Sequence, residues 1–210
     1  MKTNINYQTR LSRVFITGAA LGAAIFAASA LQAQNTTPPP ESNISHRAKE
    51  FLKEAAQANQ TEIAMANAAE GKTQNAQVKE LAHMMRTDHE QNYAQVQTLA
   101  QAHGITLDAS LDMLNQHEVN RLQKVHDADF DKDYTKVMLK DHVKCIKRFE
   151  KAGADIEEQD VKQYALNTLP ALRHHLQKSE EAARSAGLDE ATIVSILKDL
   201  PSEDRPVSSR

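Results

Sequence analysis

Four long stretches of the chain repeat their apolar residues every three or four positions, and this periodicity constrains the fold more than any other feature. The stretches cover about residues 45–69, 75–103, 129–152 and 157–186. Such spacing places apolar side chains on one face of an α-helix, whereas a half-buried strand needs a spacing of two. Aromatic residues make up only 4% of the chain, which also favours helices over sheets. The sequence therefore predicts four helices, each about 37 Å long.

The connections between these stretches predict how the helices pack. Residues 70–75 and 153–156 form short connections, so each joins two antiparallel neighbours. Residues 105–128 form a long connection that can run the length of a bundle and that contains a short helical piece. A last short helix is expected at 189–200. We predict an all-α, ferritin-like antiparallel four-helix bundle with a long crossover between helices two and three and a short C-terminal helix.

Individual residues predict where the helices begin, bend and end. Ser45 is expected to cap the first helix, and Asp127 or Asp129 the third. Gly153 is expected to end the third helix. Pro170 lies inside the fourth, where it should kink the helix or open one backbone hydrogen bond.

The N-terminus has the pattern of a cleaved Sec-type signal peptide. Three basic residues precede an apolar run at 14–30, and small residues after it offer a cut after Ala33 or, alternatively, Ala30. This pattern predicts a periplasmic or cell-envelope location for the processed protein. The alternative is a retained transmembrane anchor, for which a run of 17 residues is at the short limit.

The remaining chain divides into three parts. Residues 34–44 form a Pro-rich linker, residues 45–200 the four-helix domain, and residues 201–210 a polar tail that is expected to be disordered.

Charge and cysteine content exclude several kinds of partner and chemistry. The chain has 25 Lys and Arg against 28 Asp and Glu, and residues 1–33 hold three of the basic residues and no acidic one. The processed protein would be acidic, which argues against nucleic acid or anionic lipid as a partner. Cys145 is the only cysteine, so an intramolecular disulfide is impossible. No nucleophile elbow, phosphate-binding glycine loop or CxxC motif is present, so we predict no catalytic residues.

Each predicted helix carries one metal-capable side chain on its inward face. At 100° per residue, these side chains are Glu62, His89, His142 and His175, each within about a turn of its helix midpoint. In a bundle they should lie near one level. Buried His and Glu are costly unless they are paired or ligated, so this layer is a candidate site.

Two interpretations of the layer remain open. One is a site for a single zinc, iron or manganese ion, bound by three imidazoles and one carboxylate. The other is a metal-free polar layer whose hydrogen bonds set the register of the helices. Asp88 and Asp141, each directly before a histidine, either accept from a His ring N–H on a neighbouring helix or are solvated boundary residues.

The other candidate residues do not belong to this layer. Glu80 and His83 have the ExxH spacing of di-iron bundles but fall on the outer face of their helix. His174 also points outward, and Cys145 is expected to fill space in the core.

The pieces "TEIAMANAA", "VKELAHMMRTDHEQN", "FDKDYTKVMLKDHVKCIKRFE" and "VKQYALNTLPALRHHL" resemble an exported bacterial family of ferritin-like bundles. That family is catalogued as a domain of unknown function, and its members are often labelled membrane or outer membrane proteins. The resemblance covers about residues 45–187. It implies a ferritin-like fold, an envelope location and polar positions at Glu62, His89, His142 and His175, but no activity. The chain lacks the paired inward Glu-x-x-His motifs of di-iron members of the fold, which argues against an iron store or oxidase.

Two functions follow as expectations. The first is an exported, non-catalytic helical bundle that acts as a binding or stress-protection module in the envelope, with a partner that the sequence does not identify. The second is a metalloprotein that holds one transition-metal ion in the Glu/His layer.

Overall fold

Six helices build the part of the chain that the structure describes, and no strand occurs there. The computed structural model describes residues 44–201 and 205. The helices are α1 (His46–Lys72), α2 (Ala76–Ala102), α3 (Met113–Gln123), α4 (Asp127–Asp155), α5 (Gln159–Ser185) and α6 (Glu190–Leu197). The predicted signal peptide, nearly all of the linker and most of the C-terminal tail lie outside the described residues. None of the six helices is both long enough and apolar enough to span a bilayer.

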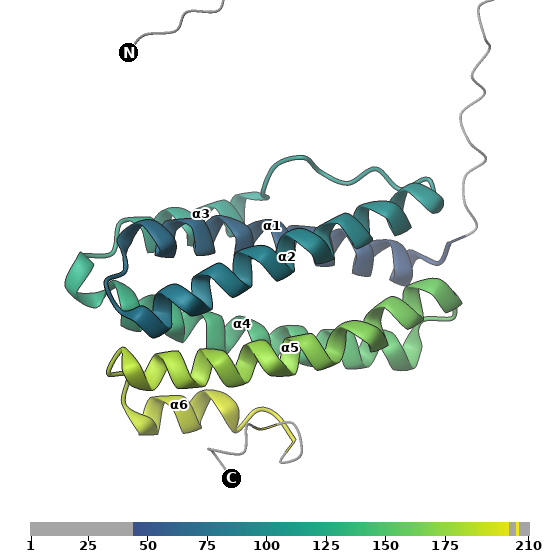
Figure 1. Ribbon diagram of the computed structural model, residues 1–210. Coiled ribbons are helices and arrows are strands. Elements are labelled where there is room, and N and C mark those ends of the chain that lie inside the picture. The colour runs from purple at the N-terminus through teal and green to yellow at the C-terminus, as the bar shows by residue number, and fades with distance from the viewer. Residues whose placement is uncertain (1–43, 202–204, 206–210) are drawn as a thin grey trace, which may run out of the picture. The chain divides into compact units, whose positions relative to one another are not determined.

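The four long helices form a bundle of two hairpins. Figure 1 shows the α1–α2 hairpin stacked on the α4–α5 hairpin. The hairpins meet along two seams, one between α1 and α4 and the other between α2 and α5. The crossover helix α3 packs on α1 and α4. The C-terminal helix α6 packs on α4 and α5. This arrangement confirms the predicted ferritin-like bundle with a long crossover. It also leaves the α2–α5 seam without a covering helix among the described residues.

Apolar residues fill the bundle in two clusters. One cluster includes Phe51 and Phe149, whose rings meet edge to face with centroids 5.0 Å apart. The other includes Met65, Met85 and Met138, all fully buried. Burial of side chains of this size contributes about 1.5–3 kcal/mol each. Along α1 and α2, polar side chains lie between residues of the two clusters, so the site is placed in the middle of a well-packed core.

The N-terminal cap of α1 is as predicted, whereas that of α4 is not. The Ser45 hydroxyl accepts a hydrogen bond from the Ala48 N–H. At α4 the cap is His126, whose Nδ1 accepts from the Ala128 N–H at 3.3 Å. The prediction of Asp127 or Asp129 as the cap is therefore wrong: both lie in the first turn, where acidic groups stabilise the positive end of the helix dipole.

Gly153 does not end α4, contrary to the prediction. The helix continues to Asp155, and a Cβ added at Gly153 would lie only 2.5 Å from Cδ2 of Leu166 on α5. The glycine therefore permits close approach of two helices rather than a change of chain direction. Pro170 lies inside α5 and cannot donate to the Leu166 carbonyl, so α5 lacks one helical hydrogen bond at this point.

Candidate metal centre

Three histidines from three helices form the centre. His89 on α2, His142 on α4 and His175 on α5 have exposures of 7%, 1% and 3%. Their ring centroids are 5.3 to 5.8 Å apart, and one ring nitrogen of each lies within 4.8 Å of the others. The structure thus brings together three of the four residues that the helical wheels placed at one level.

Each imidazole has an inner nitrogen, which faces the other histidines, and an outer nitrogen, which faces away from them. In two of the histidines the outer nitrogen must carry the proton. His142 Nδ1 lies 2.9 Å from the Met138 carbonyl one turn earlier on α4. His175 Nε2 lies 2.9 Å from Oδ2 of Asp88 on α2. A carbonyl and a carboxylate only accept, so each of these ring nitrogens donates. Asp88 therefore makes the contact with a neighbouring helix, which is one of the two roles that the sequence left open for it.

The third histidine is oriented by Asn59 on α1. Nδ2 of Asn59 lies 2.8 Å from the Ala55 carbonyl, which fixes the orientation of the amide group because a carbonyl must face a donor. Oδ1 of Asn59 then faces Nδ1 of His89 at 2.8 Å, so this ring nitrogen also donates. The sequence alone did not single out Asn59. Its place three residues before Glu62, on the same inward helix face, was a signal that could have revealed it.

These outer contacts leave three lone pairs facing inward when the rings are neutral. They belong to His89 Nε2, His142 Nε2 and His175 Nδ1. The first is buried without a hydrogen-bond partner, and the other two lie 3.3 Å apart. A tetrahedral ion with bonds of about 2.0–2.1 Å holds its ligand nitrogens about 3.3–3.4 Å apart. The spacing of this pair therefore matches two ligands of one ion.

The electrostatic environment keeps the rings neutral. Burial, and then repulsion from the neighbouring histidines, lowers the pKa of His89 well below its usual value. Burial lowers the pKa of His142 to about 3, and His175 adds to this effect. Burial also lowers the pKa of His175, although the Asp88 carboxylate partly opposes it. Neutral imidazole is the form that binds a metal ion.

Glu62 and Asp141 lie outside the group of histidines. No carboxylate oxygen of Glu62 belongs to the group within 4.8 Å, and its buried Oε2 has no hydrogen-bond partner. Burial, and then the negative charge of Asp141, raises the pKa of Glu62 well above its ordinary value, which favours the neutral acid. Asp141 pairs with Lys144 at 3.1 Å on its own helix. Among the described hydrogen bonds it accepts none from a histidine ring, so the outer role considered for it does not apply.

The other sequence candidates lie outside the centre. His83 contacts Glu70 and Arg86 at the surface, and His174 is exposed. Burial raises the pKa of the Cys145 thiol to about 12, so this sulfur is protonated and is a poor metal ligand.

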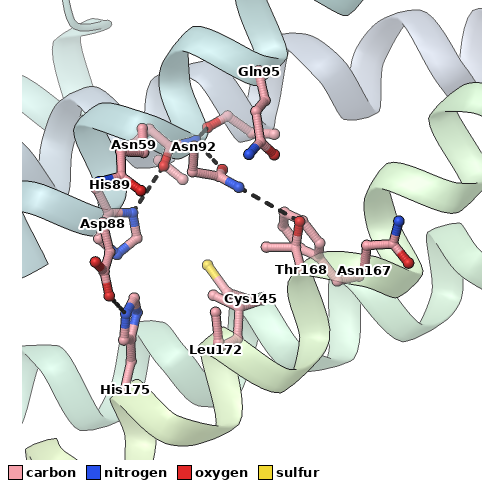
Figure 2. A pocket seen from close by; sticks show the side chains of 15 residues that line it. Asn59, Asp88, His89, Asn92, Gln95, Cys145, Asn167, Thr168, Leu172 and His175 are labelled. Carbon is pink, nitrogen blue, oxygen red and sulfur yellow. Dashed lines mark hydrogen bonds and ion pairs between the residues drawn. The ribbon is translucent and has the colours of Figure 1, made fainter.

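A pocket of about 470 Å³ opens beside the centre, between α2 and α5. Figure 2 shows His89, Asp88 and His175 on one side of it, with the Cys145 sulfur pointing inward. Its lining consists of Ala55, Ala58, Asn59, Asp88, His89, Gln91, Asn92, Gln95, Cys145, Phe149, Asn167, Thr168, Ala171, Leu172 and His175. The centre is therefore accessible from the seam that no described helix covers.

A network of hydrogen bonds makes the inner wall of this pocket rigid. Oδ1 of Asn92 accepts from Nδ2 of Asn59 at 2.8 Å and from the Tyr164 hydroxyl at 2.7 Å. The Thr168 hydroxyl donates to the Tyr164 carbonyl at 2.8 Å. The network connects α1, α2 and α5 and holds Asn59 in the orientation that His89 requires.

Comparisons with known proteins identify the fold and the family. No curated protein matches the chain. Among solved structures, the chain is similar to a crystal structure of a DUF305 fragment from Deinococcus radiodurans, with a TM-score of 0.60 and 13% sequence identity. That match covers 67% of this chain and 97% of the fragment, and it shows a common fold. The family model described as "Domain of unknown function (DUF4142)" matches residues 33–182, so the chain belongs to the DUF4142 family.

Proposed function

We propose that this protein binds one transition-metal ion through Nε2 of His89, Nε2 of His142 and Nδ1 of His175. One observation carries the proposal: each outer nitrogen donates to an acceptor, so three lone pairs face inward in a buried space. Contacts that fix the tautomer and orientation of a ligating histidine are characteristic of protein metal sites.

A proton explains the arrangement less well than a metal ion. One proton on His175 Nδ1 could bridge to His142 Nε2, with Asp88 balancing the charge. That proton would leave His89 Nε2 buried and without a partner. It would also place a charge where burial disfavours one. A single cation with vacant coordination positions accepts all three lone pairs at once.

The donor set favours zinc. Three neutral imidazoles suit Zn²⁺, whereas manganese prefers carboxylate and carbonyl oxygens. Glu62 is not required for this set, so iron bound by carboxylates receives less support than zinc. The ligands come from three helices, and in the zinc sites that have three protein ligands a further position is left for a ligand from solvent.

We also propose that the protein works in the periplasm or cell envelope, as a non-catalytic binding or stress-protection module. The basic N-terminus, the apolar run at 14–30 and the small residues after it support export.

A metal-free role for the layer is the second candidate. It is supported by the contact of 3.3 Å between His142 and His175, which one shared proton could bridge without an ion.

Metal analysis of the purified protein tests the first proposal. Zinc content is measured by elemental analysis after dialysis, and affinity by competition with a chromophoric chelator. About one zinc per chain is expected for the wild type and for His174→Ala, an exposed neighbour of His175 that serves as control. His142→Ala and His175→Ala should each lose most of the zinc. The first proposal fails if the wild type holds far less than one zinc per chain, or if His142→Ala holds as much zinc as the wild type. The metal-free layer would then be the function of these residues.

A further inference from the structure

We propose that the pocket beside the histidines binds a carboxylate that is joined to one or two amide groups, as in an acylated dipeptide or the C-terminal end of a peptide. The carboxylate binds to the metal at the coordination position that the three histidines leave open. The amide groups hydrogen-bond to carboxamide side chains farther along the pocket. This inference rests on the proposed metal binding.

The open coordination position is accessible from the pocket. His89 and His175 both line it, so an ion that they hold lies at its inner end. Three nitrogen ligands leave one position of a tetrahedral ion for an exogenous oxygen. A carboxylate is a natural occupant because it binds the metal and compensates its charge.

Three carboxamides on the polar wall beyond the metal have no protein partner. Gln91 and Gln95 on α2 and Asn167 on α5 line the pocket and are exposed. Within the described chain, none of these three side chains hydrogen-bonds to another protein group. Each offers a donor and an acceptor, which is the pattern that complements an amide. Figure 2 shows Gln95 and Asn167 at the pocket, away from His175.

The length of this wall indicates the length of the ligand. Asn167 precedes His175 by eight residues, which is about 12 Å along a helix at 1.5 Å per residue. An extended peptide spans about 3.3–3.6 Å per residue, so the wall matches about three residue-sized units. N-acetyldiglycine has this length and fits within about 470 Å³.

The charges around the pocket limit the ligand to one carboxylate. Its lining residues include no Lys or Arg, and Asp88 is the only carboxylate among them. The metal is then the only positive charge, and a second carboxylate on the ligand would have no cation to pair with. The floor is apolar, with Ala55, Phe149 and Leu172, so the body of the ligand is uncharged and compact.

The test uses the purified protein loaded with Co²⁺, whose visible spectrum reports changes in coordination. Four ligands are titrated: acetate (head only), octanoate (the same chain length without amides), N-acetyldiglycine, and its C-terminal amide. N-acetyldiglycine should change the spectrum and bind about tenfold more tightly than acetate or octanoate, because two hydrogen bonds are gained. The amide, which lacks the carboxylate, should not change the spectrum. Metal content is measured in the same samples.

Matched variants locate the amide contacts. Gln95→Ala and Asn167→Ala should each reduce the preference for N-acetyldiglycine over octanoate about threefold to fivefold. Gln97→Ala and Gln163→Ala remove exposed carboxamides on the same helices outside this pocket and should not change the preference. All four variants should keep one cobalt per chain.

The outcomes separate the inference from the function on which it rests. If the protein binds no cobalt or zinc, the proposed function fails and the inference fails with it. If one cobalt binds but octanoate binds as tightly as N-acetyldiglycine, or no carboxylate changes the spectrum, only the inference is overturned. A ten-residue peptide ending in Gly-Gly distinguishes the two sources of the ligand. If this peptide binds, the natural ligand is the C-terminal end of a peptide chain. If it does not bind although N-acetyldiglycine does, the natural ligand is a short free acyl peptide.

Discussion

Replacing Asn59 by Ala should weaken metal binding although Asn59 is not a ligand. The change removes the acceptor of the His89 Nδ1–H and both hydrogen bonds donated by Nδ2. His89 could then turn over or adopt the other tautomer, which points its lone pair away from the centre. Loss of an outer contact of this kind typically lowers metal affinity 10- to 100-fold.

The same substitution should destabilise the metal-free protein by about 1.5–3.5 kcal/mol. A buried, unpaired His89 N–H costs about 1–3 kcal/mol, and the lost hydrogen bond to Asn92 adds about 1 kcal/mol. The Asn92 oxygen keeps its bond from the Tyr164 hydroxyl, so its desolvation is not an added cost. The higher helix propensity of Ala returns about 0.5 kcal/mol. Urea unfolding in the presence of a chelator measures this difference.

Two variants separate orientation of His89 from general loss of stability. Asn59→Asp keeps an oxygen acceptor for His89 but not the donor, so zinc affinity should recover toward the wild-type value while stability stays low. Gln60 lies next to Asn59 on α1. Gln60→Ala removes hydrogen bonds to the Tyr93 hydroxyl and to the Asp108 carbonyl, and it should leave zinc affinity unchanged. A zinc affinity for Asn59→Ala within twofold of the wild type would refute the argument that His89 needs its tautomer fixed.

Three further predictions concern the metal-free protein and the backbone. The pKa of His142 is about 3 in the folded protein against an ordinary value of 6.5, so the unfolded chain binds more protons between these pH values. The free energy of unfolding, measured with urea, should therefore fall as pH drops through this window, by about 1.4 kcal/mol per pH unit at most. His142→Gln should make this pH dependence weaker. The pKa of Glu62 is raised, so its burial should cost stability increasingly as pH rises above about 4.5; Glu62→Gln should be more stable than the wild type at pH 8, and an equal urea midpoint would contradict this. Gly187 has a φ of 79°, so Gly187→Ala should lower stability by about 1 kcal/mol in thermal melts, whereas Gly71→Ala, inside α1 with no atom within 4 Å of its Cβ position, should be neutral or stabilising.

Much of the fold could be predicted because it depends on local periodicity. The helix phases that placed His89, His142 and His175 inward follow from 3.6 residues per turn alone. The errors arise where tertiary packing decides. Gly153 lies against Leu166 of another helix, so a residue that commonly ends helices is retained inside one.

The chemistry of the centre could be predicted only in part. A helical wheel gives the direction of Glu62 but not the distance from its carboxylate to the histidines, which depends on rotamer and helix separation. The contact of Asn59 with His89 depends on how far α1 is displaced along α2, and no sequence periodicity encodes that displacement. The pocket follows from the position of the crossover, because α3 covers one seam and leaves the other open.

The division of the ligands between hairpins has a consequence for folding kinetics. His142 and His175 belong to the α4–α5 hairpin, while His89 belongs to the α1–α2 hairpin. Each hairpin consists of contacts that are near in sequence and can form quickly, whereas the centre is complete only after the hairpins dock. A bound ion would therefore act as a late crosslink: it would slow the separation of the hairpins, and so the unfolding rate, much more than it would speed refolding.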